Sequence, residues 1–330
     1  MEYPKFKVCV RCFTYNQSKY ITDALNGFCM QETNFPFVCC VVDDASTDGE
    51  QEVINKYVEQ HFNLEDTAVA YKKETDYAYI TYAQHKTNKN CYFAVLLLKR
   101  NYYSTGEGEK KMEYISEWLD NVEYEALCEG DDWWLSEHKL QKQYDILESH
   151  PEVDMCACGA IDYKDGKQIN KQCPSETERI LSVNEVILGG GGYVMTASLM
   201  FRESINHYGY QFIRQFLIDY FLQILGSLRG GMYFLPECMA AYRREADNSW
   251  TMRMIKNTFE NMLFISKVVE TLGVLDKETN LIYHEPITIK QLDYFRSLSI
   301  FGIHSSLVLK KMKFRTKLSL IKSLLKSLLF

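Results

Sequence analysis

The sequence predicts an α/β protein whose mostly parallel central sheet is flanked by helices. Short continuous runs of β-prone apolar residues alternate along the chain with stretches of helical periodicity, the order typical of βαβ units. Hydrophobic residues make up 46% of the 330 positions and charged residues 25%, so the chain can bury a large core. These values exclude a disordered or collagen-like protein.

The first elements are expected to be a strand, a helix, a second strand and a second helix. Residues 7–13 form a short apolar run without turn residues, and residues 21–31 show helical spacing. Residues 38–42 read V-C-C-V-V, as expected of a strand covered on both faces. Thr47 and Glu50 then match a capping box, which predicts a second helix that runs to about residue 60.

The alternation continues through the rest of the chain. Residues 63–90 lack clear periodicity and are interpreted as an insertion between core strands, and the polar residues 101–111 as a mobile loop. After about residue 248 the pattern is helical. The remaining expected elements are strands at 94–98, 125–128, 153–158, 232–235 and 240–243 and helices at 137–148 and 212–228.

Charge and cysteine content limit the classes of partner and compartment. The net charge is −7, and the last 25 residues carry seven cations and no acid, so the rest of the chain carries −14. An acidic body disfavours nucleic acid as a partner. The eleven cysteines are an odd number and lie mostly in apolar runs, and the first residues lack the apolar region of a signal peptide. We therefore expect reduced, mostly buried thiols in a cytoplasmic protein.

The first candidate site follows the first two strands. Thr14, Tyr15 and Asn16 come directly after one strand, and Asp43 and Asp44 come after the next. The carboxyl ends of parallel strands share one edge of a sheet, where ligands bind in open α/β sheets. An aromatic ring and a carboxylate can hold a nucleobase, by stacking and by accepting an imide N–H. The alternative is that the polar residues shape a turn and the acids cap a helix.

The second candidate site is the segment E-G-D-D-W-W at residues 129–134, which follows an apolar run. The adjacent carboxylates of Asp131 and Asp132 raise each other's pKa unless a cation offsets them. Mg²⁺ and Mn²⁺ prefer such oxygen ligands and often bridge carboxylates to substrate phosphates. The indoles of Trp133 and Trp134 favour a ligand pocket beside the acids. The alternative is an acidic turn that caps the next helix.

Two further positions carry isolated charges. Asp219 lies in an otherwise apolar helical stretch, where it faces either solvent or a pocket. Arg243 ends a strand, where it either clamps a diphosphate or pairs with a nearby acid.

Taken in order, these motifs resemble the inverting glycosyltransferases of family 2, which have the GT-A fold. The resemblance covers roughly residues 5–250, and the E-G-D-D-W-W motif is typical of the bacterial polysaccharide-type branch. The matching motifs are T-Y-N at 14–16, Gln31, D-D-x-S-x-D at 43–48, E-G-D-D-W-W at 129–134, K-L-x-x-Q at 139–143, Asp219 and Y-R at 242–243.

The resemblance implies a metal-dependent transfer of a hexose or N-acetylhexosamine from a nucleotide-diphosphate sugar, UDP-linked, to a hydroxyl of a glycan or lipid-linked saccharide. Asp219 would be the general base, and Asp131 and Asp132 would bind Mn²⁺ or Mg²⁺, either of them being the direct ligand. Trp133 and Trp134 would line the acceptor pocket. The residues implied to bind the nucleotide sugar are Thr14, Tyr15, Asn16, Asp44, Asp131 and Arg243.

One position departs from the family pattern. Glu245 stands where the closing Y-R-x-H motif has His, which leaves Arg243 as the expected contact to the diphosphate. The substitution keeps open a second class of function, a catalytically silent GT-A module that holds a nucleotide sugar or scaffolds a membrane-associated assembly. The retained aspartates favour the enzyme.

The resemblance also suggests a domain organisation. Residues 1–248 would form the catalytic domain, with the nucleotide-sugar part at about 1–135 and the acceptor part at about 136–248, and residues 249–305 a helical extension. In residues 306–330 apolar side chains at helical spacing are flanked by seven cations, which predicts an interfacial helix on an anionic membrane. The alternative is a helix packed on the acidic body. We expect a cytoplasmic protein bound peripherally to the inner face of the membrane.

Overall fold

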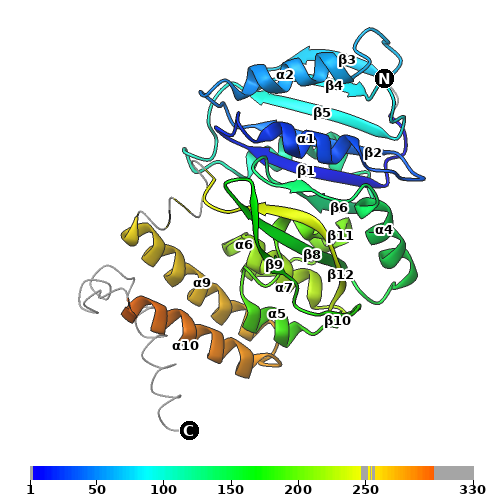
Figure 1. Cartoon of the computed structure of the whole chain (residues 1–330). Coiled ribbons are helices and arrows are strands. Elements are labelled where there is room, and N and C mark those ends of the chain that lie inside the picture. The colour runs from blue at the N-terminus through cyan, green and yellow to red at the C-terminus, as the bar shows by residue number, and fades with distance from the viewer. Residues whose placement is uncertain (1–2, 247–251, 253, 255–256, 301–330) are drawn as a thin grey trace, which may run out of the picture. The chain divides into compact units, whose positions relative to one another are not determined.

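The computed structural model describes residues 3–246, 252, 254 and 257–300 (Figure 1). The chain divides into two compact units, which are described separately. Unit 1 comprises residues 1–182, 192–208 and 226–249 and contains the sheet. Unit 2 comprises residues 183–191, 209–225 and 250–330, and its described part is helical.

The sheet of unit 1 has the strand order β10-β12-β8-β11-β6-β1-β2-β5-β4-β3, with β7 paired to β12 and β9 to β8. The strands are β1 (Val8–Thr14), β2 (Phe37–Asp43), β3 (Ala70–Glu74), β4 (Ala78–Gln84), β5 (Cys91–Leu98), β6 (Tyr124–Leu127), β7 (Trp133–Trp134), β8 (Met155–Lys164), β9 (Lys167–Gln172), β10 (Arg179–Leu181), β11 (Met200–Arg202) and β12 (Met232–Arg243). The helices in this unit are α1 (Ile21–Cys29), α2 (Glu50–His61), α3 (Lys110–Leu119) and α4 (Lys139–Ser149), with 3₁₀ turns η1 (Thr196–Ser198) and η2 (Glu203–His207).

The centre of the sheet is parallel and its flanks are mixed. Strands β5, β2, β1 and β6 run parallel as neighbours, as the sequence predicts. Outside them β4 pairs antiparallel with β5, and β11 pairs antiparallel with β6. Further out, β12 pairs parallel with β8. The fold is therefore α/β, with a parallel core that places the carboxyl ends of β2, β1 and β6 side by side.

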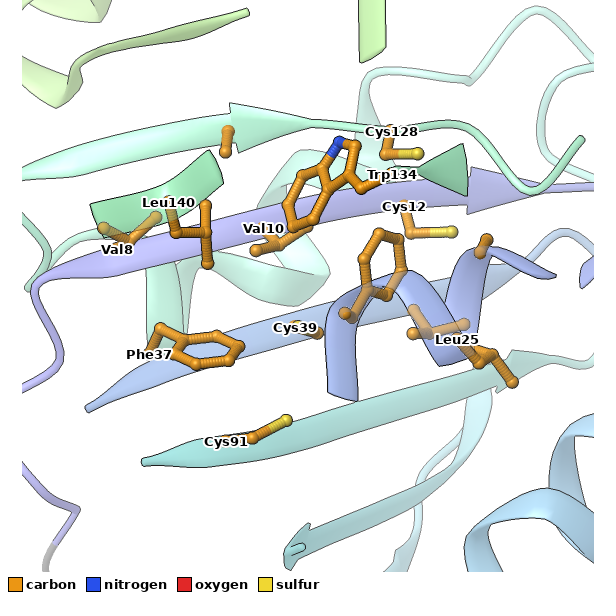
Figure 2. Packing of buried hydrophobic residues seen from close by; sticks show 14 of the residues in the cluster. Val8, Val10, Cys12, Leu25, Phe37, Cys39, Cys91, Cys128, Trp134 and Leu140 are labelled. Atoms are coloured by element: carbon orange, nitrogen blue, oxygen red, sulfur yellow. The ribbon is translucent and has the colours of Figure 1, made fainter. Parts of the chain in front are cut away.

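Both faces of the central strands are buried, which explains why they read as continuous apolar runs. Along β2, Cys39 and Val41 face one apolar cluster and Cys40 and Val42 face the other. Helices α1, α2 and α4 cover the first face and α3 the second. Figure 2 shows part of the first cluster, which contains Trp134 together with side chains from β1, β2 and β5.

All eleven cysteines lie in the described part of the chain and are free, as expected. Cys9 and Cys12 have C-x-x-C spacing, but they belong to the clusters on opposite faces of the sheet. A strand alternates its side chains between faces, so this spacing does not bring the two thiols together.

Three predicted segments differ from the observed elements. The presumed insertion at 63–90 contains β3 and β4, which extend the sheet as an antiparallel edge. Tyr and Thr alternate with apolar residues in β4, and these amphipathic side chains obscure the period of two. The helix expected at 212–228 is two helices, because the backbone leaves the helical conformation at Phe216, where φ is −158° and ψ is 88°. The strands expected at 232–235 and 240–243 are one strand, β12, interrupted by a bulge.

Unit 2 contains α5 (Val183–Gly189), α6 (Gln211–Gln215), α9 (Thr258–Glu278) and α10 (His284–Ile300), together with residues 219–225 of α7 (Asp219–Ser227). Glu278 caps α6 by accepting the backbone N–H groups of Gln211 and Phe212. Helices α9 and α10 thus occur where the helical pattern after residue 248 predicts them. Unit 2 also contains residues 183–191 and 209–225, which belong to the region predicted as catalytic domain. None of the helices in the described ranges is long and apolar enough to span a bilayer. The predicted basic helix at 306–330 lies outside the described residues.

Candidate functional site

The candidate site lies where three neighbouring central strands of unit 1 end. The backbone of Asp44 donates to Thr14 O at 3.0 Å, which ties the end of β2 to the end of β1. On the other side of β1, Gly130 N donates to Phe13 O at 3.3 Å. The structure therefore brings the Thr14–Asn16 segment, the two acids after β2 and the acidic segment after β6 to one edge of the sheet.

The loop after β1 is fixed by polar contacts to the loop after β2. Asn16 has a left-handed backbone with φ 55°, and its backbone N–H donates to Ser46 Oγ at 2.8 Å. Its side-chain oxygen accepts from Thr47 N at 2.7 Å. Tyr15 lies between Thr14, whose backbone oxygen accepts from Asp44, and the anchored Asn16, and its side chain remains 40% exposed. An exposed ring held on a rigid loop is a suitable stacking surface for a planar ligand.

Asp44 is buried and already engaged with the protein. Its two oxygens accept the backbone N–H groups of Tyr102 and Tyr103 at 2.7 and 3.0 Å, and Lys111 Nζ lies 3.5 Å away. The segment expected to be a mobile loop is thus anchored on this carboxylate. Oδ2 accepts from both Tyr103 and Lys111, whereas Oδ1 accepts only from Tyr102 and keeps a second lone pair, so an imide donor would share Oδ1 with the Tyr102 N–H.

The acidic pair after β6 is placed in two different environments. Asp132 is 3% exposed, and its Oδ1 accepts the backbone N–H of Arg243 at 2.9 Å. Burial raises the pKa of Asp132 well above its usual range, and the neighbouring Asp131 raises it further. Asp131 is only partly buried; burial raises its pKa too, while a hydrogen bond from the Gln17 side chain and the charge of Arg243 oppose that rise.

The donor set suits a hard divalent cation. Two adjacent carboxylates whose ionised forms are disfavoured by burial and by each other gain from a positive ion between them. Asp131 and Asp132 would hold Mn²⁺ or Mg²⁺, each with oxygen donors of the type these ions prefer.

Gly130 is required by the close approach of the acidic turn to the loop after β1. A Cβ placed on Gly130 would lie 2.2 Å from Thr14 Oγ1 and 2.5 Å from Gln17 Oε1. No side chain fits in that space, so glycine allows the acidic turn to pack directly on Thr14.

Arg243 is held by several groups of unit 1. Its guanidinium donates to Asp23 at 2.7 Å and to the Asp131 backbone oxygen at 3.0 Å. It also stacks between the rings of Tyr20 and Trp133, at 4.6 and 4.5 Å from their centroids. Arg243 thus pairs with a nearby acid, Asp23, and it also contacts the acidic pair. Its contact to a diphosphate stays a prediction.

The two tryptophans point in opposite directions because they are consecutive residues of the short strand β7. Trp133 is partly exposed and contacts Arg243 and Tyr163. Trp134 is 1% exposed and lies within the apolar cluster (Figure 2). Its indole N–H donates to Ala197 O at 2.9 Å. Trp134 is therefore a core residue rather than a wall of an open pocket, and only Trp133 remains a candidate for acceptor contact.

The Trp134→Ala variant is expected to lose about 3–5 kcal/mol of unfolding free energy, because a large buried ring leaves a cavity against Phe28. Trp134→Phe should lose much less, since most of the packing stays. Urea denaturation of both variants measures the difference. A loss below about 1 kcal/mol for the alanine variant would contradict the assignment to the core.

The other two motifs of the resemblance, Gln31 and K-L-x-x-Q at 139–143, pack next to the acidic turn. Gln31 donates to Ser136 O at 2.8 Å and accepts from Leu140 N at 3.0 Å, which joins α1 to the start of α4. Lys139 is completely buried, donates to Gln143 Oε1 at 2.7 Å and lies 4.4 Å from the Trp134 ring centroid. Burial lowers the pKa of Lys139. The K-L-x-x-Q motif is thus part of the packing around β7.

Asp219 is the first residue of α7 and is exposed. It belongs to unit 2, whereas the acidic pair belongs to unit 1. Its role as general base therefore stays a prediction.

Sequence reasoning missed Glu50, a completely buried acid near the site. The capping box is wrong: Gly49 is the N-cap, with φ 90°, and Glu50 N donates to Asp48 Oδ1 at 3.1 Å. The Glu50 side chain turns into the protein and contacts Thr14, Gln17 and Ser46. A capping box and an inward-facing acid have the same sequence pattern, so no sequence signal separated them.

Parts of this chain are similar in sequence to known proteins. Residues 10–93 match the family model described as "Glycosyl transferase family 2". Uncharacterized proteins of Mycobacterium tuberculosis and Mycobacterium bovis are 30% identical over 238 residues, which is 72% of this chain. The match spans 58% of the length of these relatives.

Solved structures of S. aureus TarS, residues 1–349, have a similar fold. The complex with UDP aligns with a TM-score of 0.51 at 15% identity, covering 91% of this chain and 93% of TarS 1–349. The complex with UDP-GlcNAc aligns with a TM-score of 0.51 at 16% identity, covering 89% and 90%. The chain thus has the GT-A fold, and its residues 10–93 match the family model of glycosyl transferase family 2.

Proposed function

We propose that the protein is a metal-dependent inverting glycosyltransferase that uses a nucleotide-diphosphate sugar. The observation that carries the proposal is the acidic pair at the sheet edge, packed against the loop that presents Tyr15. The family 2 domain at residues 10–93 and the GT-A fold support a sugar-transferring enzyme. UDP is the preferred nucleotide, since the similar TarS structures contain UDP and UDP-GlcNAc.

The donor would be held by the residues at the strand ends. Tyr15 offers a face on which the base stacks, while Thr14, Asn16 and Asp44 fix the loops around it. Asp131 and Asp132 would hold the divalent ion, and the ion would neutralise the negative charge that develops on the leaving diphosphate. Arg243 adds a positive charge beside the pair and is already oriented by its two aromatic neighbours.

The acceptor hydroxyl needs a base. In the proposal the Asp219 carboxylate takes the proton as the acceptor oxygen attacks the anomeric carbon, which inverts the configuration of that carbon. Trp133 would contact the acceptor sugar. The acceptor is a glycan or lipid-linked saccharide. Residues 306–330 would bind the cytoplasmic protein to the anionic inner face of the membrane.

A second candidate function is a silent GT-A module that binds a nucleotide sugar without transfer. It is favoured by Glu245, which replaces the family's His and bonds to Lys164 at 2.6 Å. The Arg244 guanidinium donates to the buried Asp162 at 2.8 Å.

A donor-hydrolysis assay separates the two functions. We expect the wild-type protein to release UDP slowly from a UDP-sugar in the presence of Mn²⁺ and to stop when a chelator is added. A matched control, Asp145→Asn on the exposed face of α4, should hydrolyse at the wild-type rate. Nucleotide binding without any hydrolysis, over a panel of UDP- and GDP-sugars, would favour the silent module.

A further inference from the structure

Asp23 lies in the first turn of α1 and links that helix to Arg243, the last residue of β12. Its Oδ2 accepts from Arg243 Nη2 at 2.7 Å. Tyr20 is the N-cap residue of the same helix, and its ring centroid lies 4.6 Å from the guanidinium carbon. The start of α1 therefore holds the Arg243 side chain by one ion pair and one aromatic ring.

The acidic turn contacts the same side chain independently. Arg243 Nε donates to the backbone oxygen of Asp131 at 3.0 Å, and the Trp133 ring centroid lies 4.5 Å from the guanidinium carbon. The backbone N–H of Arg243 donates to Asp132 Oδ1 at 2.9 Å. Arg243 thus connects the first turn of α1 to the segment that carries the acidic pair.

The backbone of α1 is fixed on both sides of Asp23. Before it, Tyr20 N donates to Gln17 O at 2.8 Å, which anchors the start of the helix on the loop after β1. One turn after it, a Cβ on Gly27 would lie 2.9 Å from Trp134 N, so the helix packs directly on the backbone of β7. Asp23 therefore extends from a support that has little freedom to move relative to the acidic turn.

These contacts leave one nitrogen of the Arg243 guanidinium unused. The group has five N–H bonds, one on Nε and two on each Nη. Nε and Nη2 have the partners described above, whereas neither N–H of Nη1 has an acceptor among the residues that the structure describes. Because the side chain is already held, an anion that binds Nη1 has little further ordering of the arginine to cause.

We propose that Asp23 is a positioning residue for the donor diphosphate, which acts by fixing the Arg243 guanidinium beside the acidic pair. This role rests on the proposed function, in which Arg243 contacts the diphosphate. The Asp23 side chain is 53% exposed, so its ion pair contributes little to folding. The effect of Asp23 is therefore expected in the binding of phosphate groups.

Asp23 has two effects on a diphosphate, and they have opposite signs. Its negative charge repels the anion, so loss of the charge alone strengthens UDP binding. Its hydrogen bond orients Arg243, so loss of the acceptor weakens UDP binding. Asp23→Ala removes both, while Asp23→Asn removes the charge and keeps an oxygen that can accept from Nη2. The sign of the change in Asp23→Ala identifies the larger effect.

Calorimetric titrations provide the first test. We expect Asp23→Ala to weaken UDP binding with Mn²⁺ by about tenfold, the contribution of about one hydrogen bond, and Asp23→Asn to stay within about twofold of the wild type. Uridine has no phosphate and should bind all three proteins equally. The matched control is Glu52→Gln, which removes an exposed acid from the first turn of α2 and should leave UDP binding unchanged.

Tighter UDP binding by Asp23→Ala, or an equal loss of uridine binding, would overturn the positioning role. A double-variant cycle then tests the connection through Arg243. In the Arg243→Leu background, Asp23→Ala should not weaken UDP binding further, because the group that Asp23 orients is gone. Additive losses would overturn the connection.

NMR of the arginine side chains tests the contact without nucleotide. The Nη protons of Arg243, assigned with the help of Arg243→Lys, should give separate signals at low temperature in the wild type and in Asp23→Asn, because the bond to residue 23 hinders rotation of the guanidinium. In Asp23→Ala these signals should merge. Signals that are already merged in the wild type, or that stay separate in Asp23→Ala, would overturn the proposal. If the wild type binds no nucleotide at all, the proposed function fails and the diphosphate role with it, while the NMR result still decides whether Asp23 fixes Arg243.

Discussion

The Asp219→Asn variant is expected to bind a UDP-sugar with wild-type affinity and to transfer the sugar about 10²–10⁴ times more slowly. An Asn amide has nearly the same shape as the carboxylate but cannot take the proton of the acceptor hydroxyl. Because the base acts only on the acceptor, the donor affinity should not change. Single-turnover transfer rates and calorimetric donor binding, measured on the same preparation, separate the two effects.

The matched control for Asp219 is Asp293→Asn, an exposed acid on α10 in the same unit. It should leave both the transfer rate and the donor affinity unchanged. Near-normal transfer by Asp219→Asn would exclude Asp219 as the base. A loss of donor binding equal to the loss of rate would assign it to the donor site instead.

The second large effect is expected at Asp132. Asp132→Asn should lower Mn²⁺-dependent UDP affinity by about 100-fold or more, since even groups that only support a metal ligand typically contribute about 10- to 100-fold. Folding should not suffer, because the Asn oxygen can still accept the Arg243 backbone N–H and a buried like-charge pair is relieved. Melting temperature without metal and UDP titrations with Mn²⁺ test the two halves of this expectation.

Binding that stays the same in Asp132→Asn, and that also survives a chelator, would contradict the metal role. A fall in affinity accompanied by an equal fall in melting temperature would point instead to a structural defect around β6 and β7. Asp145→Asn again serves as the control, since it removes one acid far along α4 without touching the sheet edge.

The parallel core and the candidate site could be predicted because strand ends in such a sheet fix where the following residues lie. The apolar run at 38–42 predicted a strand buried on both faces, and β2 is one. Its carboxyl end then had to lie beside that of the first strand, which brought Asp44 next to Thr14. Apolar patterning and chain order were sufficient for this part.

Side-chain direction at turns could not be predicted in the same way. Trp133 and Trp134 form a two-residue strand, too short for its alternation to be recognised, so Trp134 was expected in a pocket and lies in the core. Glu50 was expected to cap its own helix, but Gly49 and Asp48 define the helix start and release Glu50 to the interior. Both outcomes depend on tertiary contacts that no local pattern contains.

The central claim is that Asp131 and Asp132 together hold a divalent ion against the diphosphate of the donor. The most direct measurement is the anomalous scattering of Mn²⁺ in crystals of the protein grown with UDP. The account predicts a peak at bonding distance from a carboxylate oxygen of at least one of the two aspartates and from the diphosphate. Well-ordered UDP with its diphosphate away from both aspartates and no peak beside them would contradict it.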